Sequence, residues 1–112
     1  MGNNFIVYLY GFSTILDDKL DTLIEIIEIQ IEQDNQIKIV FIHDGVIGTS
    51  QKHIVSHSME KLLKLPITFY SLIPDLEARG IETNKLWNKI KGINYEELVD
   101  ILVNTPKIVS WI

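Results

Sequence analysis

The chain has 112 residues, of which 46% are apolar and 22% are charged, and it contains no cysteine. This length suits one compact domain, and the composition is typical of a soluble globular protein rather than a disordered or membrane-spanning one. The lack of cysteine excludes a disulfide framework, a thiolate metal site, a cysteine nucleophile and a persulfide carried on this chain. A net charge of −5 argues against direct contact with nucleic acid or an anionic membrane surface, because both are negatively charged.

The N-terminal residues carry no recognisable targeting signal. Met1 leads through Gly2–Asn4 into an apolar run, with no basic segment and no small-residue cleavage site. No apolar stretch approaches the roughly 18 residues that a membrane span requires. We therefore expect a cytoplasmic protein that does not enter a membrane.

The first half of the chain alternates between strand and helix patterns. Residues 5–10 are apolar, β-branched or aromatic and end at Gly11, which predicts a buried strand. Residues 15–34 predict a helix with one apolar face, which consists of Leu16, Leu20, Leu23, Ile24, Ile27 and Ile31. A second strand is expected at 37–43. The helix expected at 51–64 would bury Val55, Met59, Leu62 and Leu63.

A third strand is expected at 67–72, and the elements predicted after it are shorter. Pro74 begins a single helical turn, which Gly80 can end in the left-handed conformation that glycine tolerates. Residues 84–91 are expected to form a short helix around Leu86, Trp87 and Ile90.

A capping box marks the last helix of the chain. Asn94 and Glu97 have the required spacing, and the helix that they begin is expected to bury Tyr95, Leu98, Val99 and Leu102. A closing strand is expected at 107–112. Because strands and helices alternate, we predict one α/β domain over residues 1–112, with a mostly parallel sheet of about five strands between two helical layers.

Acidic residues gather on the first predicted helix. Residues 17–34 contain one basic side chain, Lys19, against the acids Asp17, Asp18, Asp21, Glu25, Glu28, Glu32 and Asp34. We interpret these acids as a solvated helix face, with a docking surface for a basic partner as the alternative. Ile26 and Ile29 lie away from the apolar stripe of this helix. They are either isolated exposed residues or part of a subunit interface.

Three segments follow strand ends, where α/β proteins usually bind ligands; they are residues 11–14, 43–48 and 72–80. In the second segment, His43 and Asp44 could offer a base and a hydrogen-bond acceptor. The Asp44-Gly45 pair is more typical of an ordinary turn in which glycine supplies a positive φ. The sequence contains no glycine-rich nucleotide-binding motif and no hydrolase Gly-x-Ser-x-Gly motif.

One group of side chains has metal-ligand spacing. His53, His57 and Glu60 would lie on one face of the helix predicted at 51–64, and imidazole and carboxylate groups suit zinc. The same face also carries two lysines. An ordinary exposed surface is therefore the preferred interpretation, and we expect neither a metal nor a cofactor.

Three motifs carry a family resemblance. A Tyr-x-Leu-x-x-Asp-Leu-x-Ala-Arg-Gly stretch is formed by Tyr70, Leu72, Asp75, Leu76, Ala78, Arg79 and Gly80. The turn after the second strand contains Asp44, Gly45 and Val46, with His43 in the preceding position. The C-terminal part contains Asn94-Tyr95, Leu98-Val99 and Trp111, where the family has Asp-Tyr, Phe-Val and a terminal Trp. On these motifs the sequence resembles the DsrH/TusB family over nearly its whole length.

The resemblance implies a DsrE-like fold and a place in a sulfur-relay complex of the DsrEFH or TusBCD type. Such complexes hand persulfide sulfur between proteins for tRNA 2-thiouridine modification or for sulfur oxidation. A cysteine carries the sulfur, because a thiolate can attack a persulfide and be regenerated. Some DsrH-type members have a cysteine early in the first helix, whereas residues 20–24 here have none. The resemblance therefore implies a TusB-type subunit that is not an enzyme and assembles with DsrE/TusD-like and DsrF/TusC-like partners.

Several interpretations stay open at this point. Asp75 and Arg79 have the spacing of a side-chain pair within one turn, and Arg79 could instead bind a carboxylate of a partner. Trp87 and Trp111 fit either a core or an interface. The alternative functions are a small ligand- or metal-binding protein and a homo-oligomer unrelated to sulfur.

Overall fold

A parallel sheet forms the middle layer of the protein, for which a computed structural model describes residues 4–15, 17–52 and 55–112. Its strands, in chain order, are β1 (Phe5–Tyr10), β2 (Gln36–Phe41), β3 (Thr68–Leu72), β4 (Ile90–Ile93) and β5 (Lys107–Trp111). They lie in the order β4-β3-β2-β1-β5, and each neighbouring pair is parallel. The expectation of a mostly parallel sheet of about five strands is confirmed.

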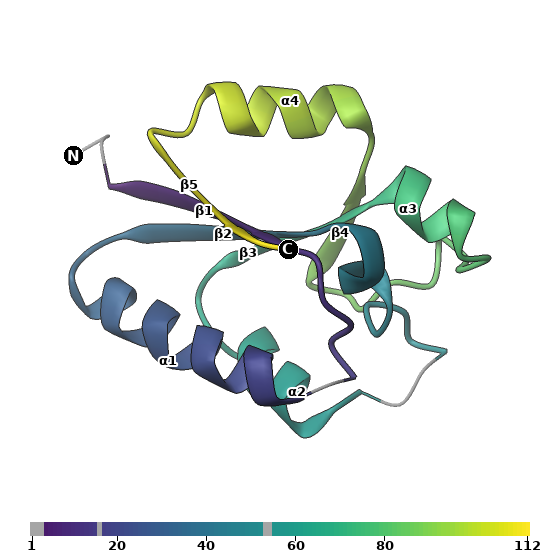
Figure 1. Cartoon of the computed structure of the whole chain (residues 1–112), viewed down its shortest axis with the longest axis horizontal. Helices are drawn as coiled ribbons and strands as arrows, with labels where there is room; N and C mark the ends of the chain where they lie inside the picture. Colours follow the sequence, from purple (N-terminus) through teal and green to yellow (C-terminus); the bar gives the residue numbers. More distant parts are fainter. Residues whose placement is uncertain (1–3, 16, 53–54) are drawn as a thin grey trace.

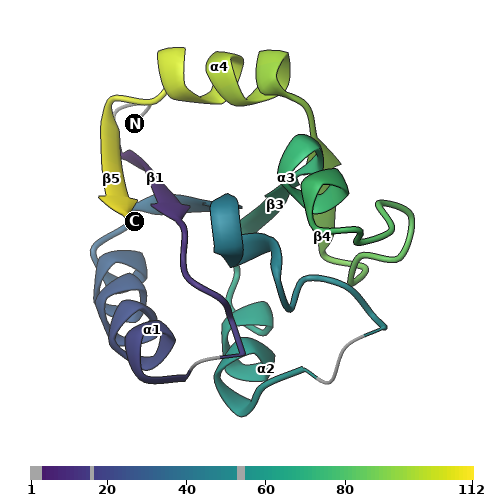
Figure 2. The same ribbon diagram turned by 45° about the vertical axis from the view of Figure 1, so that its right-hand side comes forward.

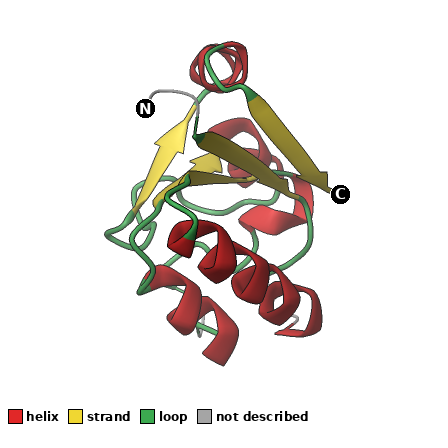
Figure 3. Cartoon of the chain, turned by 90° about the vertical axis from the view of Figure 1, so that its left-hand side faces the viewer, coloured by secondary structure: helices red, strands yellow, loops and turns green. Residues whose placement is uncertain are grey.

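Helices cover both faces of this sheet (Figure 1). The helices α1 (Asp17–Glu32) and α2 (His57–Leu63) lie on one face, and α4 (Tyr95–Val103) lies on the other. The short helices η1 (His43–Val46) and α3 (Ile73–Ala78) follow β2 and β3. Figure 3 shows the same layers from the side, so the α/β/α architecture is confirmed. Within the described ranges, no helix has both the length and the apolar character needed to cross a membrane.

The larger core lies between the sheet and the layer of α1 and α2. Its fully buried helix residues are Leu20, Leu23, Ile27, Met59 and Leu62, which pack with Tyr8, Tyr10, Ile39, Phe41 and Phe69 of the sheet. Full burial of one such aliphatic side chain contributes roughly 1.5–3 kcal/mol. The predicted stripe of the first helix is confirmed at these positions and at Ile24. Ile31 is only half-buried, and Leu16 lies outside the described residues.

The smaller core lies under α4. Its buried residues all come from the sheet and the strand ends: Val7, Val40, Ile42, Leu72 and Ile93. The helix contributes the half-buried Leu98, Ile101 and Leu102, and none of its residues is fully buried. The capping box is confirmed, because the Asn94 side chain accepts from Glu97 N–H and the Glu97 carboxylate accepts from Asn94 N–H. The expected burial of Tyr95 and Val99 is wrong, since both side chains are more than half exposed.

The helix predicted at 84–91 is wrong, and the helix predicted at 51–64 is confirmed only over its second half, as α2 (His57–Leu63). Residues 49–51 and 85–87 pair with each other through the antiparallel Ser50–Leu86 bridge. Gln51 N–H donates to the Lys85 carbonyl at 2.6 Å, and Trp87 N–H donates to the Thr49 carbonyl at 3.0 Å. These long-range bonds occupy backbone groups that a helix would use, so α2 begins only at His57 and no helix forms at 84–91. The strand β4 follows instead, and its four residues were not predicted.

Candidate functional site

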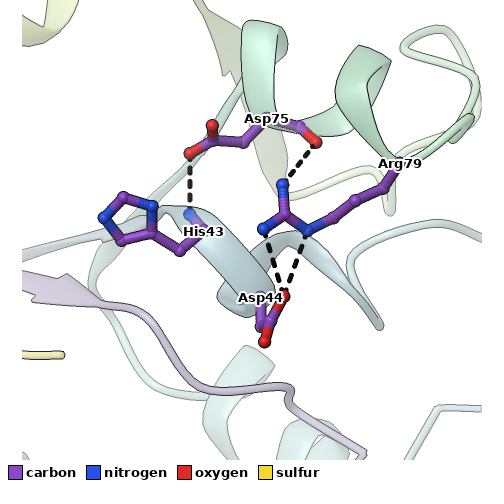
Figure 4. A network of polar contacts seen from close by, with 4 residues as sticks. All are labelled: His43, Asp44, Asp75 and Arg79. Carbon is purple, nitrogen blue, oxygen red and sulfur yellow. Dashed lines mark hydrogen bonds and ion pairs between the residues drawn. The ribbon is translucent and has the colours of Figure 1, made fainter.

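A network of polar side chains lies beyond the carboxyl ends of β2 and β3 (Figure 4). These strands are neighbours in the sheet, so η1, which follows β2, lies next to α3, which follows β3. Pro74 occupies the first turn of α3, where its missing N–H costs nothing, and Arg79 caps the other end. The topology thereby brings together two motifs that are about thirty residues apart in the sequence.

The Arg79 guanidinium group donates hydrogen bonds to both short helices, η1 and α3. Its Nε and Nη2 donate to Oδ1 of Asp44 at 3.2 and 3.1 Å, and Nη1 donates to the backbone carbonyl of Asp75 at 3.1 Å. The predicted side-chain pair between Asp75 and Arg79 is therefore wrong. The carboxylate that pairs with Arg79 is that of Asp44, from η1.

The Asp75 carboxylate has a different partner. Its Oδ2 accepts a hydrogen bond from the backbone N–H of His43 at 2.7 Å. His43 has a φ of 51°, in the left-handed region that non-glycine residues avoid at a cost of roughly 1–2 kcal/mol. The hydrogen bond from His43 N–H to the Asp75 carboxylate favours this conformation, although solvent screens part of the attraction. Asp75 thus holds the start of η1 in place, and the imidazole of His43 remains exposed.

Gly45 is required for close packing, not for a turn. A Cβ at this position would lie 2.1 Å from the carbonyl oxygen of Tyr10, at the end of β1. The positive φ expected at Gly45 occurs instead at His43. The next residue, Val46, is fully buried, so η1 is anchored to the core directly behind the exposed Asp44. Gly80 does have a positive φ, of 68°, and ends α3 as predicted.

Buried hydroxyl groups fix the loops around this network, and sequence reasoning missed them. Thr49 Oγ1 donates to the Val46 carbonyl at 2.7 Å and lies 3.2 Å from Ser71 Oγ, in β3. Thr14 Oγ1 donates to the Ile47 carbonyl at 2.9 Å, and Ser56 Oγ donates to the Thr14 carbonyl at 2.7 Å. Thr14 and Thr49 lie between predicted elements, which gave a weak signal, whereas Ser56 and Ser71 lie inside a predicted helix and a predicted strand.

The two tryptophans lie near opposite edges of the sheet, Trp111 in β5 and Trp87 shortly before β4. Trp111 is half-buried, and its ring centroid lies 6.3 Å from that of Tyr10. The Tyr10 hydroxyl is buried without a hydrogen-bond partner in the described part of the chain, and burial raises its pKa to about 12. Trp87 is also half-buried, and its indole N–H donates to the Gly48 carbonyl at 3.3 Å. Both tryptophans therefore contribute to the core.

The remaining candidate residues lie apart from this network. Tyr70 is half-buried under α4, whereas Tyr95 is exposed on the outer side of α4. His57 and Glu60 lie in α2, and His53 falls outside the described residues. Among the residues that the structure describes, no group of three or more His, Asp or Glu side chains could hold a metal ion.

The first helix presents acids to solvent, as predicted. Asp18, Glu25, Glu28, Glu32 and the following Asp34 are exposed; nothing is described for the Asp17 side chain. Asp21 accepts a hydrogen bond from the Ser58 hydroxyl, which joins α1 to α2. Ile29 is exposed among three of the glutamates, and Ile26 packs against the core.

The network is suited to holding a surface in shape. Each nitrogen of the Arg79 guanidinium donates a hydrogen bond within the chain, so three of its five N–H donors hold η1 and α3 together. The Asp44 carboxylate and the His43 imidazole face solvent, and the Arg79 side chain is partly exposed as well. The fold and this edge define the chain as a small α/β/α domain with a parallel five-stranded sheet.

Comparison with known proteins gives the family. The family model described as "DsrH like protein" matches residues 13–108. Protein TusB of Pectobacterium atrosepticum is 34% identical over 92 residues, which cover 82% of this chain and 86% of that protein. Protein TusB of Pectobacterium parmentieri is 33% identical over the same shares. The chain belongs to the DsrH/TusB family.

Solved structures agree with the fold. The ychN protein from E. coli has a TM-score of 0.73 at 14% identity and covers 97% of this chain and 99% of its own. MTH1491 from Methanobacterium thermoautotrophicum, described as a protein of unknown function, has a TM-score of 0.67 at 15% identity, with coverages of 96% and 98%. At these identities the likeness establishes the fold alone.

Proposed function

We propose that this chain is a non-catalytic subunit of a sulfur-relay complex and acts by assembling with DsrE/TusD-like and DsrF/TusC-like partners. Membership of the DsrH/TusB family together with the absence of cysteine carries the proposal. Relay of persulfide sulfur requires a thiolate that attacks and is regenerated, and this chain has none to offer. The chain would therefore serve as a cytoplasmic, single-domain partner of subunits that hold the sulfur.

The relatives favour one pathway over the other. Each of the similar curated proteins is named TusB, which supports tRNA 2-thiouridine modification rather than sulfur oxidation. Within such a complex, Asp44, Asp75 and Arg79 would shape the η1–α3 edge without handling sulfur. The exposed carboxylate of Asp44 would be available for contact with a partner subunit.

Co-expression tests the proposal. The tagged chain should copurify with cysteine-bearing DsrE-like and DsrF-like subunits of the same cell, at a fixed ratio by light scattering. Deleting its gene should lower the 2-thiouridine content of tRNA, measured by mass spectrometry of nucleosides, and the wild-type chain should restore it. A chain that elutes alone beside both candidate subunits would contradict the assembly role. Unchanged 2-thiouridine with an intact complex would instead contradict the choice of pathway.

A further inference from the structure

The two faces of the sheet are covered unequally. One face is covered by α1 and α2, which bury several side chains completely, whereas α4 covers the other face and buries none (Figure 2). Under α4, Leu9 and Tyr70 of the sheet stay only half-buried. Side chains on the α4 side of the sheet are therefore less completely buried than those on the side of α1 and α2.

The outer side of α4 is apolar as well. Tyr95, Val99 and Val103 follow one another at intervals of four residues, which places them along one stripe of the helix. Their side chains are 58%, 54% and 77% exposed. A helix that is apolar on the side away from its own core usually has a second partner. On α1, by contrast, a single isoleucine, Ile29, is exposed among glutamates.

The charges along this stripe indicate what kind of partner fits. Glu96 and Asp100 line one shallow depression together with Tyr95 and Val99. The sequence of α4 contains three acids and no base, and among the described residues only Glu97 forms an ion pair, with Lys91 Nζ at 3.9 Å. A complementary surface is therefore apolar at its centre and carries lysine or arginine at its edge.

A second copy of this chain does not meet that requirement. A two-fold symmetric contact through α4 would place the same patch of both copies face to face. Glu96 and Asp100 of one copy would then face acids of the other, and like charges at an interface oppose association. The charge pattern selects a different protein.

We propose that the outer face of α4, formed by Tyr95, Glu96, Val99, Asp100 and Val103, is the docking surface for a relay subunit that presents an apolar patch edged by lysine or arginine. This assignment rests on the proposed function, because that function supplies the DsrE-like and DsrF-like subunits as candidates. It adds the face through which the chain binds and the chemistry of the surface that it meets.

A matched pair of substitutions tests the location. Val99→Arg places a charge in the α4 stripe, and Ile29→Arg places the same charge on α1, where the replaced side chain is 56% exposed against 54% for Val99. Both variants should keep the thermal unfolding midpoint of the wild type, since both sites face solvent. Binding to the co-expressed DsrE-like and DsrF-like subunits should weaken about tenfold or more in Val99→Arg and stay unchanged in Ile29→Arg.

A second pair of variants tests the charge of the partner surface and leaves the apolar stripe unchanged. The double variant Glu96→Lys/Asp100→Lys should weaken binding, and wild-type binding should weaken as salt is raised, because rim charges steer association. The control Glu25→Lys/Glu28→Lys makes the same charge change on α1 and should bind normally. Equal effects of the two double variants would overturn the charge argument.

The outcomes separate this inference from the proposed function. Loss of binding in the α4 variants alone supports the inference. Normal binding by Val99→Arg, or a loss confined to Ile29→Arg, overturns the α4 assignment while leaving the proposed function intact. Failure of the wild-type chain to bind either subunit overturns both. A wild-type homodimer that Val99→Arg dissociates would show that a second copy occupies the face, which also overturns the inference.

Discussion

Removing the Asp44–Arg79 ion pair one side chain at a time tests whether the η1–α3 contact stabilises the fold. The Arg79 side chain is 29% exposed and that of Asp44 is 66% exposed, so water screens much of their attraction. Both donors of Arg79 reach the same oxygen, Oδ1, which forgoes the stronger arrangement with two parallel bonds. We expect a coupling free energy of about 0.5–1 kcal/mol between the two residues.

The two single variants should lower the free energy of unfolding by different amounts. Asp44→Ala should lower the free energy of unfolding by about 0.5–1 kcal/mol, since it removes only the ion pair. Arg79→Ala should cost about 1–2 kcal/mol, because it also removes the bond to the Asp75 carbonyl. Arg79→Lys is the control, since it keeps the charge and loses the planar fork. Urea denaturation of the two single variants and the double variant gives the coupling. A coupling indistinguishable from zero would refute the contact as a stabilising one.

Three further predictions concern single residues near the strand ends. Gly45→Ala should destabilise by about 1–3 kcal/mol in urea denaturation, because its Cβ meets the Tyr10 carbonyl at 2.1 Å; an effect near zero would contradict that packing. Gly80→Ala should cost about 1 kcal/mol and Gly80→Asn less, because only the positive φ opposes a side chain there and asparagine tolerates it; equal losses would count against this cause. Tyr10→Phe should stabilise by about 1 kcal/mol at neutral pH, because the lost hydroxyl is buried without a partner among the described residues. The pKa of Tyr10 rises from 10.0 to about 12 on folding, so the unfolded chain loses this proton first and the free energy of unfolding falls as pH rises from 10 to about 12; the unfolding midpoint of Tyr10→Phe should therefore fall less steeply over that range.

Elements with strong local signals could be predicted from the sequence. The first strand, the apolar stripe of α1 and the Asn94–Glu97 capping box depend on residues a few positions apart, and the structure contains all three. The helix predicted at 51–64 is confirmed only over its second half, as α2, because residues 49–51 bond to residues 85–87 and a helix does not begin there. No pattern within either segment carries information about the other. The four-residue strand β4 was missed for the same reason, since its pairing with β3 is set by the sheet.

For the candidate site, the sequence predicted which residues matter but not which of them contact one another. Asp44, Asp75 and Arg79 could be singled out from the sequence, and their position after strand ends was predicted correctly. Their partners were not, because spacing within one turn favours Asp75 with Arg79, whereas the sheet places Asp44 closer to the guanidinium. Burial on α4 was overestimated because an apolar periodic pattern does not state which side of the helix meets the core.

The exposed stripe on α4 and the buried residues beneath it have different roles in the energetics. Val7, Val40, Ile42, Leu72 and Ile93 are already buried, so the isolated chain gains most of the available hydrophobic stabilisation of this face without a partner. Tyr95, Val99 and Val103 contribute little to that fold, and their apolar surface remains available for association. Docking on α4 would then bury new surface without first uncovering any of the core, so binding requires no rearrangement of the sheet. Under the proposed function, a chain without cysteine would then act through its partners while its own fold stays unchanged.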